Sequence, residues 1–378
     1  VLRQVIERTV PGTKISTLCI FGDQLIEDIC RRVSPGVKAD KGIAFPTSVA
    51  INHRIQNVAA SADMDMMIQV NDVVKIELAV HINGYVASQA HTVVMSANPN
   101  EPVSDRRADV ICAAKITHEA TLRKMRAGVK AEEITNITRE VAEFFQCSPV
   151  ESTYSQAINR YVFSGQKSIP NRYDVAEGKA DLEFEIGDVF VLNTCLSTGT
   201  GKARDSGMKP TVCQRDVNRT YYFKMKSAAD LFETISKNHP VFPFAVRNIS
   251  DLRQKLGLTE CLGHGVINSL PMLVERKERE TVAQFQTTVL ITHEGPMCLT
   301  PPQTMSYVHS NHNIPADSHI LALINQNMGK IELPRLSDIH IKVSLATLLT
   351  KLQLYRLLYI MPHAHRPYLH TNGNIFFT

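Results

Sequence analysis

Residues 71–95, NDVVKIELAVHINGYVASQAHTVVM, decide the fold of this chain. The run from Val73 to Val80 is rich in apolar, β-branched residues, which predicts a largely buried strand. Asn83-Gly84 is the two-residue signal for a tight hairpin turn, and a second strand follows from Tyr85 to Met95. The stretch therefore predicts a β-hairpin around which the rest of the chain is organised.

A related pattern recurs later in the chain. Residues 187–193, GDVFVLN, resemble residues 71–77, NDVVKIE, at an offset of 116 positions (187 − 71). The turn Pro11–Lys14, which precedes one helical pattern, is matched at the same offset by Ala127–Lys130 before another. Two anchors with one spacing predict a duplicated α+β unit. Its equivalent strands are expected to meet at a pseudo-symmetric centre, where a site would lie.

The composition is that of a globular protein. The chain has 378 residues, 44% of them hydrophobic and 21% charged, and a net charge of +4, which is too small to argue for nucleic-acid binding by itself. Its eight cysteines are scattered without a CxxC pair, which favours reduced thiols in the cytosol or nucleus. We find no signal peptide and no apolar run of about 20 residues. Because the chain opens on Val1 inside a helical pattern, we expect an N-terminal truncation.

Helical and extended patterns alternate along the chain. Ser104 is the expected N-cap of a helix that ends before Gly128, and residues 43–57 are expected to be extended with an interruption at Pro46. Residues 214–275 break the pattern and predict a helical insertion. The remaining expected elements are helices at 15–32 and 131–145, strands at 188–196 and 282–292, and, within the insertion, helices at 227–237 and 251–256.

The centre offers little catalytic chemistry. The strands that face it carry Glu77, Ser88, Asn193 and Gln286, of which only Glu77 is a carboxylate. Hydroxyl and amide groups are weak ligands and cannot neutralise two divalent ions. His91 is three positions from Ser88, which points the two side chains to opposite faces of a strand, so it cannot act as its base. His81 and His91 are interpreted as ordinary strand histidines.

Two segments are rich in cations. Residues 199–210, GTGKARDSGMKP, form a Gly-rich segment, and residues 214–226, QRDVNRTYYFKMK, interleave cations with Tyr221, Tyr222 and Phe223. Such a combination suits phosphate contacts and base stacking. The alternative is a solvated surface with its aromatic side chains turned inward. The candidate RNA-binding residues are Lys202, Arg204, Lys209, Arg215, Arg219, Lys224 and Lys226.

Several segments in the same order resemble the methionine aminopeptidase superfamily, and most closely its non-peptidase branch, the proliferation-associated, ErbB-receptor-binding protein family. The segments are IAFPTSVAIN (43–52), VVKIELAVHINGYVASQAHT (73–92), STGTGKARDSG (197–207), FKMKS (223–227) and VAQFQTTVL (282–290). The resemblance implies an α+β pita-bread fold with a pseudo-two-fold repeat over residues 1–330, including the insertion at 214–275. Residues 331–378 are expected to be a divergent tail. Its apolar part, 341–361, is interpreted as a core-docking helix, with a membrane or partner helix as the alternative.

The resemblance also implies that the centre lacks the metal ligands of active family members. Active members bind two metal ions through two Asp, one His and two Glu. These five positions fall, in chain order, on Glu77, Ser88, Tyr154, Asn193 and Gln286, and a further active-site His falls on Asn57. No position keeps the family's ligand, so the resemblance implies no catalytic residue, no metal and no other cofactor.

The proliferation-associated branch is linked to the large ribosomal subunit, structured RNA, ribosome biogenesis, translation and growth regulation. The resemblance therefore implies a catalytically inactive protein of the cytoplasm and nucleus or nucleolus that binds ribosome and RNA through the basic segments. One alternative is an adaptor or transcription coregulator that binds protein partners in the vacated cleft. A second is a divergent metallopeptidase that uses Glu77.

Overall fold

A computed structural model describes residues 1–33, 39–61, 64, 66–173, 182–326, 368–369 and 375–376. The tail expected at residues 331–378, with its apolar segment 341–361, thus lies outside the described residues except for β16 (Tyr368–Leu369) and β17 (Ile375–Phe376), which pair with each other. Within the described ranges, no helix has both the length and the apolar character needed to cross a membrane. All eight cysteines are free thiols.

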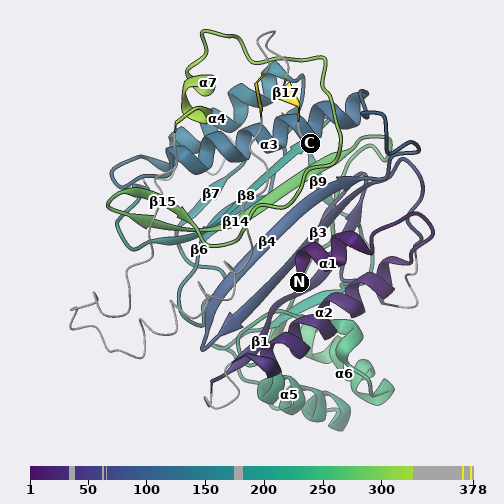
Figure 1. Ribbon diagram of the computed structural model, residues 1–378. Helices are drawn as coiled ribbons and strands as arrows, with labels where there is room; N and C mark the ends of the chain where they lie inside the picture. The colour runs from purple at the N-terminus through teal and green to yellow at the C-terminus, as the bar shows by residue number, and fades with distance from the viewer. Residues whose placement is uncertain are drawn as a thin grey trace.

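A nine-stranded antiparallel sheet forms the centre of the molecule (Figure 1). Its main path runs β1 (Lys41–Ile51), β3 (Val73–Ile82), β4 (Tyr85–Val94), β14 (Val282–Thr292), β8 (Val189–Ser197), β6 (Tyr154–Ala157) and β7 (Ser168–Pro170). Two short strands complete it: β15 (Gly295–Cys298) pairs with β14, and β5 (Ser148–Pro149) pairs with β8. The pairing of β1 with β3 shifts register on either side of Phe45, next to Pro46, which has no N–H to donate to the ladder.

The predicted repeat is present in the geometry. Helix α2 (Ile15–Arg32) and helix α4 (Ala131–Phe144) begin 116 positions apart (131 − 15), as do β3 and β8 (189 − 73). Gly12 and Gly128, which precede the two helices, both have left-handed backbones, with φ of 87° and 84°. In the sheet the two halves meet where β4 pairs with β14, and the equivalent strands β3 and β8 each lie next to this central pair, one on either side.

Four helices cover one face of the sheet: α1 (Leu2–Glu7), α2, α3 (Arg106–Lys124) and α4. Alternate residues of β3 point toward these helices: Val74, Ile76 and Leu78 pack into the core cluster that holds α1 and α2. On β14, Ala283 and Phe285 pack in the same way against α3 and α4. The intervening residues of these strands, which include the candidate site, therefore face away from the helices.

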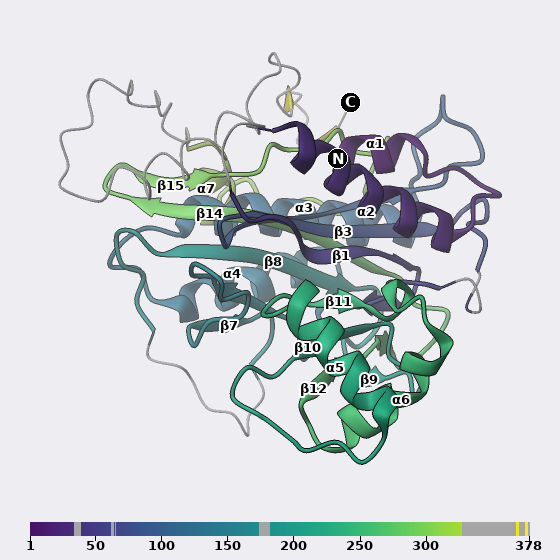
Figure 2. The same ribbon diagram turned by 90° about the horizontal axis from the view of Figure 1, so that it is seen from below.

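The helical insertion lies against the other face, below the central sheet in the view of Figure 2. Helices α5 (Lys226–Asn238) and α6 (Leu252–Gly263) pack on a small sheet of β10 (Val212–Arg215), β11 (Phe244–Ala245) and β12 (Ile267–Leu270). The second helix is longer than the predicted 251–256. A further small sheet joins β2 (Arg54–Gln56), β13 (Leu273–Glu275) and β9 (Ala203–Asp205), and a 3₁₀ turn spans Val246–Asn248.

A buried ion pair fixes the insertion to the rest of the molecule. Arg247 of the 3₁₀ turn contacts the carboxylate of Asp23 on α2, and both side chains are less than a tenth exposed. Asp23 also accepts a hydrogen bond from the backbone N–H of Thr47 at 2.7 Å. Glycine at position 22 leaves space for α2 to lie close to Thr47, since a Cβ there would lie 2.4 Å from the Thr47 hydroxyl.

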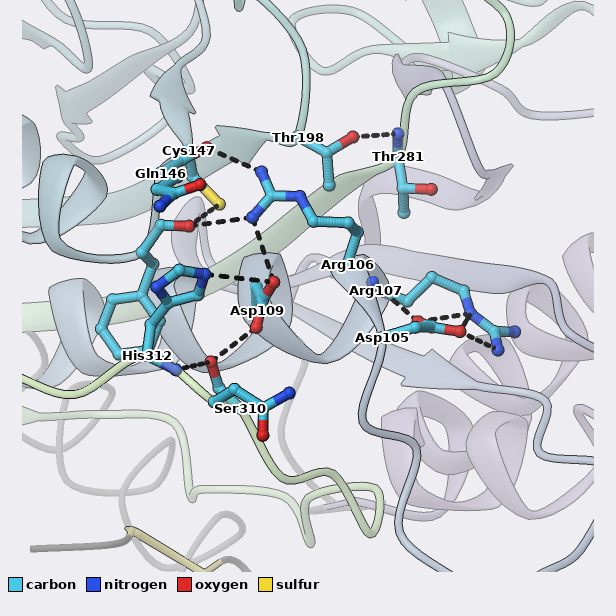
Figure 3. A network of polar contacts seen from close by, with 12 residues as sticks. Asp105, Arg106, Arg107, Asp109, Gln146, Cys147, Thr198, Thr281, Ser310 and His312 are labelled. Atoms are coloured by element: carbon cyan, nitrogen blue, oxygen red, sulfur yellow. Dashed lines mark hydrogen bonds and ion pairs between the residues drawn. The ribbon is translucent and has the colours of Figure 1, made fainter.

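The start of α3 is the centre of a second polar network (Figure 3). Its N-cap is Asp105, whose carboxylate accepts from the backbone N–H of Arg107, so the predicted cap, Ser104, is wrong by one residue. Asp109 accepts a hydrogen bond from Ser310 at 2.6 Å and pairs with Arg106 at 3.0 Å. These contacts hold the stretch that leads to α7 (His319–Ile324) against α3.

Candidate functional site

The predicted hairpin turn sets the register of the site. Asn83 and Gly84 both have positive φ, 50° and 79°, as a two-residue type I′ turn requires. Position 84 also requires glycine for lack of space, because a Cβ there would lie 2.5 Å from the Tyr161 ring. The turn pairs Ala79 with Ser88, which makes Glu77 and Ser88 diagonal neighbours on one face of the sheet.

The ladder then extends this face across the molecule. Glu77 pairs with Ala90, Ala90 with Gln286, and Gln286 with Asn193. The pairing of Gln156 with Val191 puts Tyr154 at the next position, opposite Asn193. Residues that are more than 200 positions apart in the chain thus lie on one row of the sheet, and the five predicted positions are brought together.

Amide side chains occupy the middle of this row. The Gln286 amide donates to the Ser88 hydroxyl at 2.6 Å. The Gln284 amide donates to the side-chain oxygen of Asn193 at 3.0 Å, and the Asn193 amide reaches the backbone oxygen of Tyr154 at 3.4 Å. The alternation of β14 predicts that Gln284 shares the face of Gln286, but only the structure shows that it is part of the network.

Glu77 is the one carboxylate of the row, and its surroundings favour the neutral form. Burial raises the pKa of Glu77 from 4.5 to about 7, while hydrogen bonds from Gln286 and Gln284 act in the opposite direction. The side chain keeps some accessible surface. Because burial outweighs the two amide hydrogen bonds, the site has at most one negative charge near neutral pH, and that charge is only partly formed.

Lys75, two positions before Glu77, was not singled out as a site residue. It is 1% exposed, and its ammonium donates to the backbone oxygens of Asn52 at 2.7 Å and Val282 at 3.1 Å. Burial lowers the pKa of Lys75 to about 7. Since its donors are held by backbone carbonyls of two separate segments, Lys75 joins β3 to the start of β14. The sequence feature that could have identified Lys75 is the presence of a lysine within an apolar run.

This set of donors does not fit a pair of divalent ions. It offers one carboxyl group, the hydroxyls of Ser88 and Tyr154 and several amides, whereas such a pair needs several anionic ligands. Within the ranges that the structure describes, no three His, Cys, Asp or Glu side chains gather so that they could hold a metal ion. Asn57, where the resemblance implies a further His, instead donates to the backbone oxygen of Pro271 at 2.8 Å.

The two histidines near the hairpin take no part in the row. His91 faces the helices, where its ring lies edge-on to Phe285 and Nε2 is 3.0 Å from the Thr304 oxygen. The sequence argument that His91 cannot serve Ser88 is therefore confirmed. His81 lies further along β3, with its ring 4.5 Å from that of Phe242 in the insertion. Burial lowers the pKa of both rings, to about 3 for His91, which is therefore neutral at pH 7.

The predicted basic residues fall into two groups. The first, which we call the β9 group, consists of exposed Lys202 and Arg204. It adjoins Arg276 and Lys277, because Arg204 pairs with Val274 and the N–H of Arg276 reaches the oxygen of Lys202 at 3.3 Å. Arg276 and Lys277 were missed by the sequence reasoning, since they are far from residue 202 in the chain. Lys209 is exposed on the turn that follows β9.

A buried carboxylate shapes the Gly-rich loop that leads to the β9 group. Glu275 is fully buried and accepts hydrogen bonds from the Ser197 hydroxyl at 2.7 Å and from the backbone N–H groups of Gly201 and Arg276 at 3.0 Å. Gly201 is required here, because its φ is 71° and a Cβ would lie 2.2 Å from the oxygen of Pro149. The loop that presents Lys202 is thus held in one conformation.

The second group lies on the insertion, and we call it the insertion group: Arg219, Lys224 and Lys226, all exposed. Arg215 differs from these residues. Its guanidinium lies 5.3 Å over the Phe232 ring and donates to the oxygen of Pro240 at 3.4 Å, so it also helps to pack the insertion. The structure therefore gives Arg215 an internal contact. Arg219 is exposed but pairs with Asp216 at 3.5 Å, whereas Lys224 and Lys226 extend into solvent.

Comparison with known proteins agrees with this architecture. Residues 2–195 match the family model described as metallopeptidase family M24. A methionine aminopeptidase from Thermotoga maritima has the same fold, with a TM-score of 0.52 at 13% identity over 79% of this chain and 89% of its own. The chain belongs to family M24 and has the pita-bread fold.

Two further matches place it within the family. Proliferation-associated protein A from Dictyostelium discoideum is 32% identical over 325 residues, which cover 85% of this chain and 84% of that protein. The structure of a thermophilic Arx1 has a TM-score of 0.77 and 26% identity, and the match covers 86% of this chain and 94% of that one. The chain is a member of the proliferation-associated group of M24 proteins, as the sequence motifs indicate.

Proposed function

We propose that this protein cleaves no peptide and acts as a ribosome- and RNA-binding member of its family. The absence of peptide cleavage is supported by the row Glu77–Gln286–Asn193, where amides are hydrogen-bonded to each other and to Ser88. The sequence resemblance places the metal ligands of active family members at these positions. A water-activating metal pair needs anionic ligands with free lone pairs, and this row supplies one carboxyl group whose pKa is raised.

The proposal that the protein binds ribosome and RNA rests on its exposed cations. The β9 group is exposed at one edge of a small sheet and extends through Arg276 and Lys277. Among the described residues, neither Lys202 nor Arg204 forms an ion pair with a carboxylate. Unpaired cations on a loop held by Glu275 suit phosphate contacts with structured RNA. The large ribosomal subunit and its rRNA, in the cytoplasm and the nucleolus, are the partners we propose, with roles in ribosome biogenesis, translation and growth regulation.

The absence of catalysis can be tested by metal content and turnover. Purified protein is incubated with Mn²⁺ or Co²⁺, desalted and analysed for bound metal, and its hydrolysis of a methionyl peptide is measured beside a methionine aminopeptidase as positive control. We expect less than one ion per chain and no hydrolysis. About two ions per chain together with turnover would instead support a divergent peptidase.

Ribosome binding can be tested by sedimentation with purified large subunits over a range of salt concentrations. We expect co-sedimentation that weakens as salt rises. Exchange of both Lys202 and Arg204 for Ala should weaken it further and lower the slope of log K against log salt by about 0.7 to 0.9 for each phosphate that is no longer neutralised. The matched control is Arg3→Ala with Arg139→Ala, two exposed cations on helices of the opposite face.

Two results would count against ribosome binding. If the wild-type protein stayed at the top of the gradient at every salt concentration, the adaptor alternative would be favoured. If both double variants lost affinity equally, the β9 group would not be the binding surface.

A further inference from the structure

We propose that Tyr222 is a stacking platform for an unpaired base of the RNA that the insertion binds. This inference rests on the proposed function, and it identifies a residue and a feature of the RNA. The sequence interleaves Tyr221, Tyr222 and Phe223 with cations, and that pattern left open whether the rings face inward or outward.

The structure separates the three rings. Tyr221 stacks on His264 with ring centroids 3.7 Å apart, and Phe223 lies 5.2 Å from Phe232 in the core of the insertion. Tyr222 between them is 93% exposed. The inward arrangement therefore holds for two of the rings. Because covering the third ring would remove a large apolar area from water, Tyr222 is available to contribute to binding a partner.

The backbone holds Tyr222 in place from both sides. On one side Tyr221 is fixed by its stack on His264. On the other, the backbone N–H groups of Lys224 and Met225 donate to the two oxygens of Glu260 on α6, at 2.9 and 3.1 Å. A ring on a segment that is already fixed loses little backbone entropy on binding, which favours its use as a contact.

The charges around Tyr222 favour a nucleic acid as the occupant. Lys224 and Lys226 are exposed, and within the described part of the chain neither ammonium is paired with a carboxylate. An exposed tyrosine face that is followed along the chain by two unpaired lysines offers stacking for a base and contacts for a flanking phosphate, which is how proteins bind unpaired nucleotides. Exposed Leu252 and Leu256 on α6 provide an apolar surface on the same insertion, and they supply the control for a protein partner.

The test compares two RNA hairpins that differ only by one bulged nucleotide. Their affinities are measured by fluorescence anisotropy with an end label. In a separate sample, 2-aminopurine replaces the bulged nucleotide and reports stacking through its fluorescence. We expect the wild-type protein to bind the bulged hairpin more tightly and to quench the 2-aminopurine. Tyr222→Ala should lose about tenfold in affinity for the bulged hairpin and the quenching, with an unchanged salt slope. Tyr222→Phe should keep both, since stacking needs the ring and not the hydroxyl.

The outcomes distinguish this inference from the proposed function. If the wild-type protein binds both hairpins in a salt-dependent way and Tyr222→Ala binds as well as wild type, the stacking role is overturned and RNA binding stands. If Leu252→Ala weakens capture of large subunits while Tyr222→Ala does not, the surface docks a protein, and the inference is wrong. If the wild-type protein binds neither hairpin nor subunits, both proposals fail.

Discussion

The partly buried carboxyl of Glu77 should make the stability of this protein fall as pH rises through the acid range. Its pKa in the folded protein is about 7, against 4.5 ordinarily. Between these values the folded state binds more protons at this site than the unfolded state, so the free energy of unfolding decreases with pH and then levels off above pH 7. The full shift of about 2.5 pKa units corresponds to about 3 kcal/mol.

Glu77→Gln removes this titration while it keeps the shape of the side chain and its ability to meet Gln284 and Gln286. Relative to the wild type, the variant should gain about 2 to 3 kcal/mol between pH 5 and pH 8, which is the part of the shift that falls in that window. The assay is urea denaturation of both proteins at matched ionic strength across this pH range. Lys75 is present in both proteins, so its own titration cancels in the difference.

Carbon-13 NMR of the Glu77 carboxyl gives the pKa directly and provides an independent check. A stability difference that stays constant from pH 5 to pH 8, together with a carboxyl that titrates near its ordinary value of 4.5, would refute the reasoning. It would mean that water reaches the row of amides freely and that the surroundings of Glu77 are not dry.

Two further predictions concern how the insertion is held. Arg247→Ala leaves Asp23 buried without its cation and should cost about 3 to 5 kcal/mol in denaturation experiments, whereas Arg3→Ala, which breaks an exposed pair with Glu7, should cost less than about 1 kcal/mol; equal effects would contradict the buried pair. Gly257→Ala should cost about 1 to 3 kcal/mol and speed hydrogen exchange in α5 and α6, because its Cβ would lie 2.5 Å from the backbone nitrogen of Ala228. Gly263→Ala on the same helix meets no atom within 4 Å and should be neutral or slightly stabilising, so a loss as large as that at Gly257 would rule out the close helix contact.

Much of the sheet was predictable because its signals are local. The turn at Asn83-Gly84 determines the hairpin register, and an offset of 116 positions identifies the two halves. Strand β14 occupies the predicted range 282–292, since a period of two is clear over that length. The cap at Asp105 was placed one residue early because Ser104 and Asp105 are both good N-caps, and only the bond to Arg107 distinguishes them.

By itself the sequence determined the alternation of the strands and the duplicated unit, and its resemblance to a known family predicted amides and hydroxyls in place of metal-binding carboxylates and histidine. The alternation follows from residue types a few positions apart, and the duplicated unit follows from an offset of 116 positions that two short motifs share. Only the tertiary structure decided that Glu77, Gln286 and Asn193 share one row, because their contacts depend on strand order and register over more than 200 positions. It also decided which aromatic ring of the insertion is left outside, since the core of α5 and α6 has room for Tyr221 and Phe223 but turns Tyr222 to solvent.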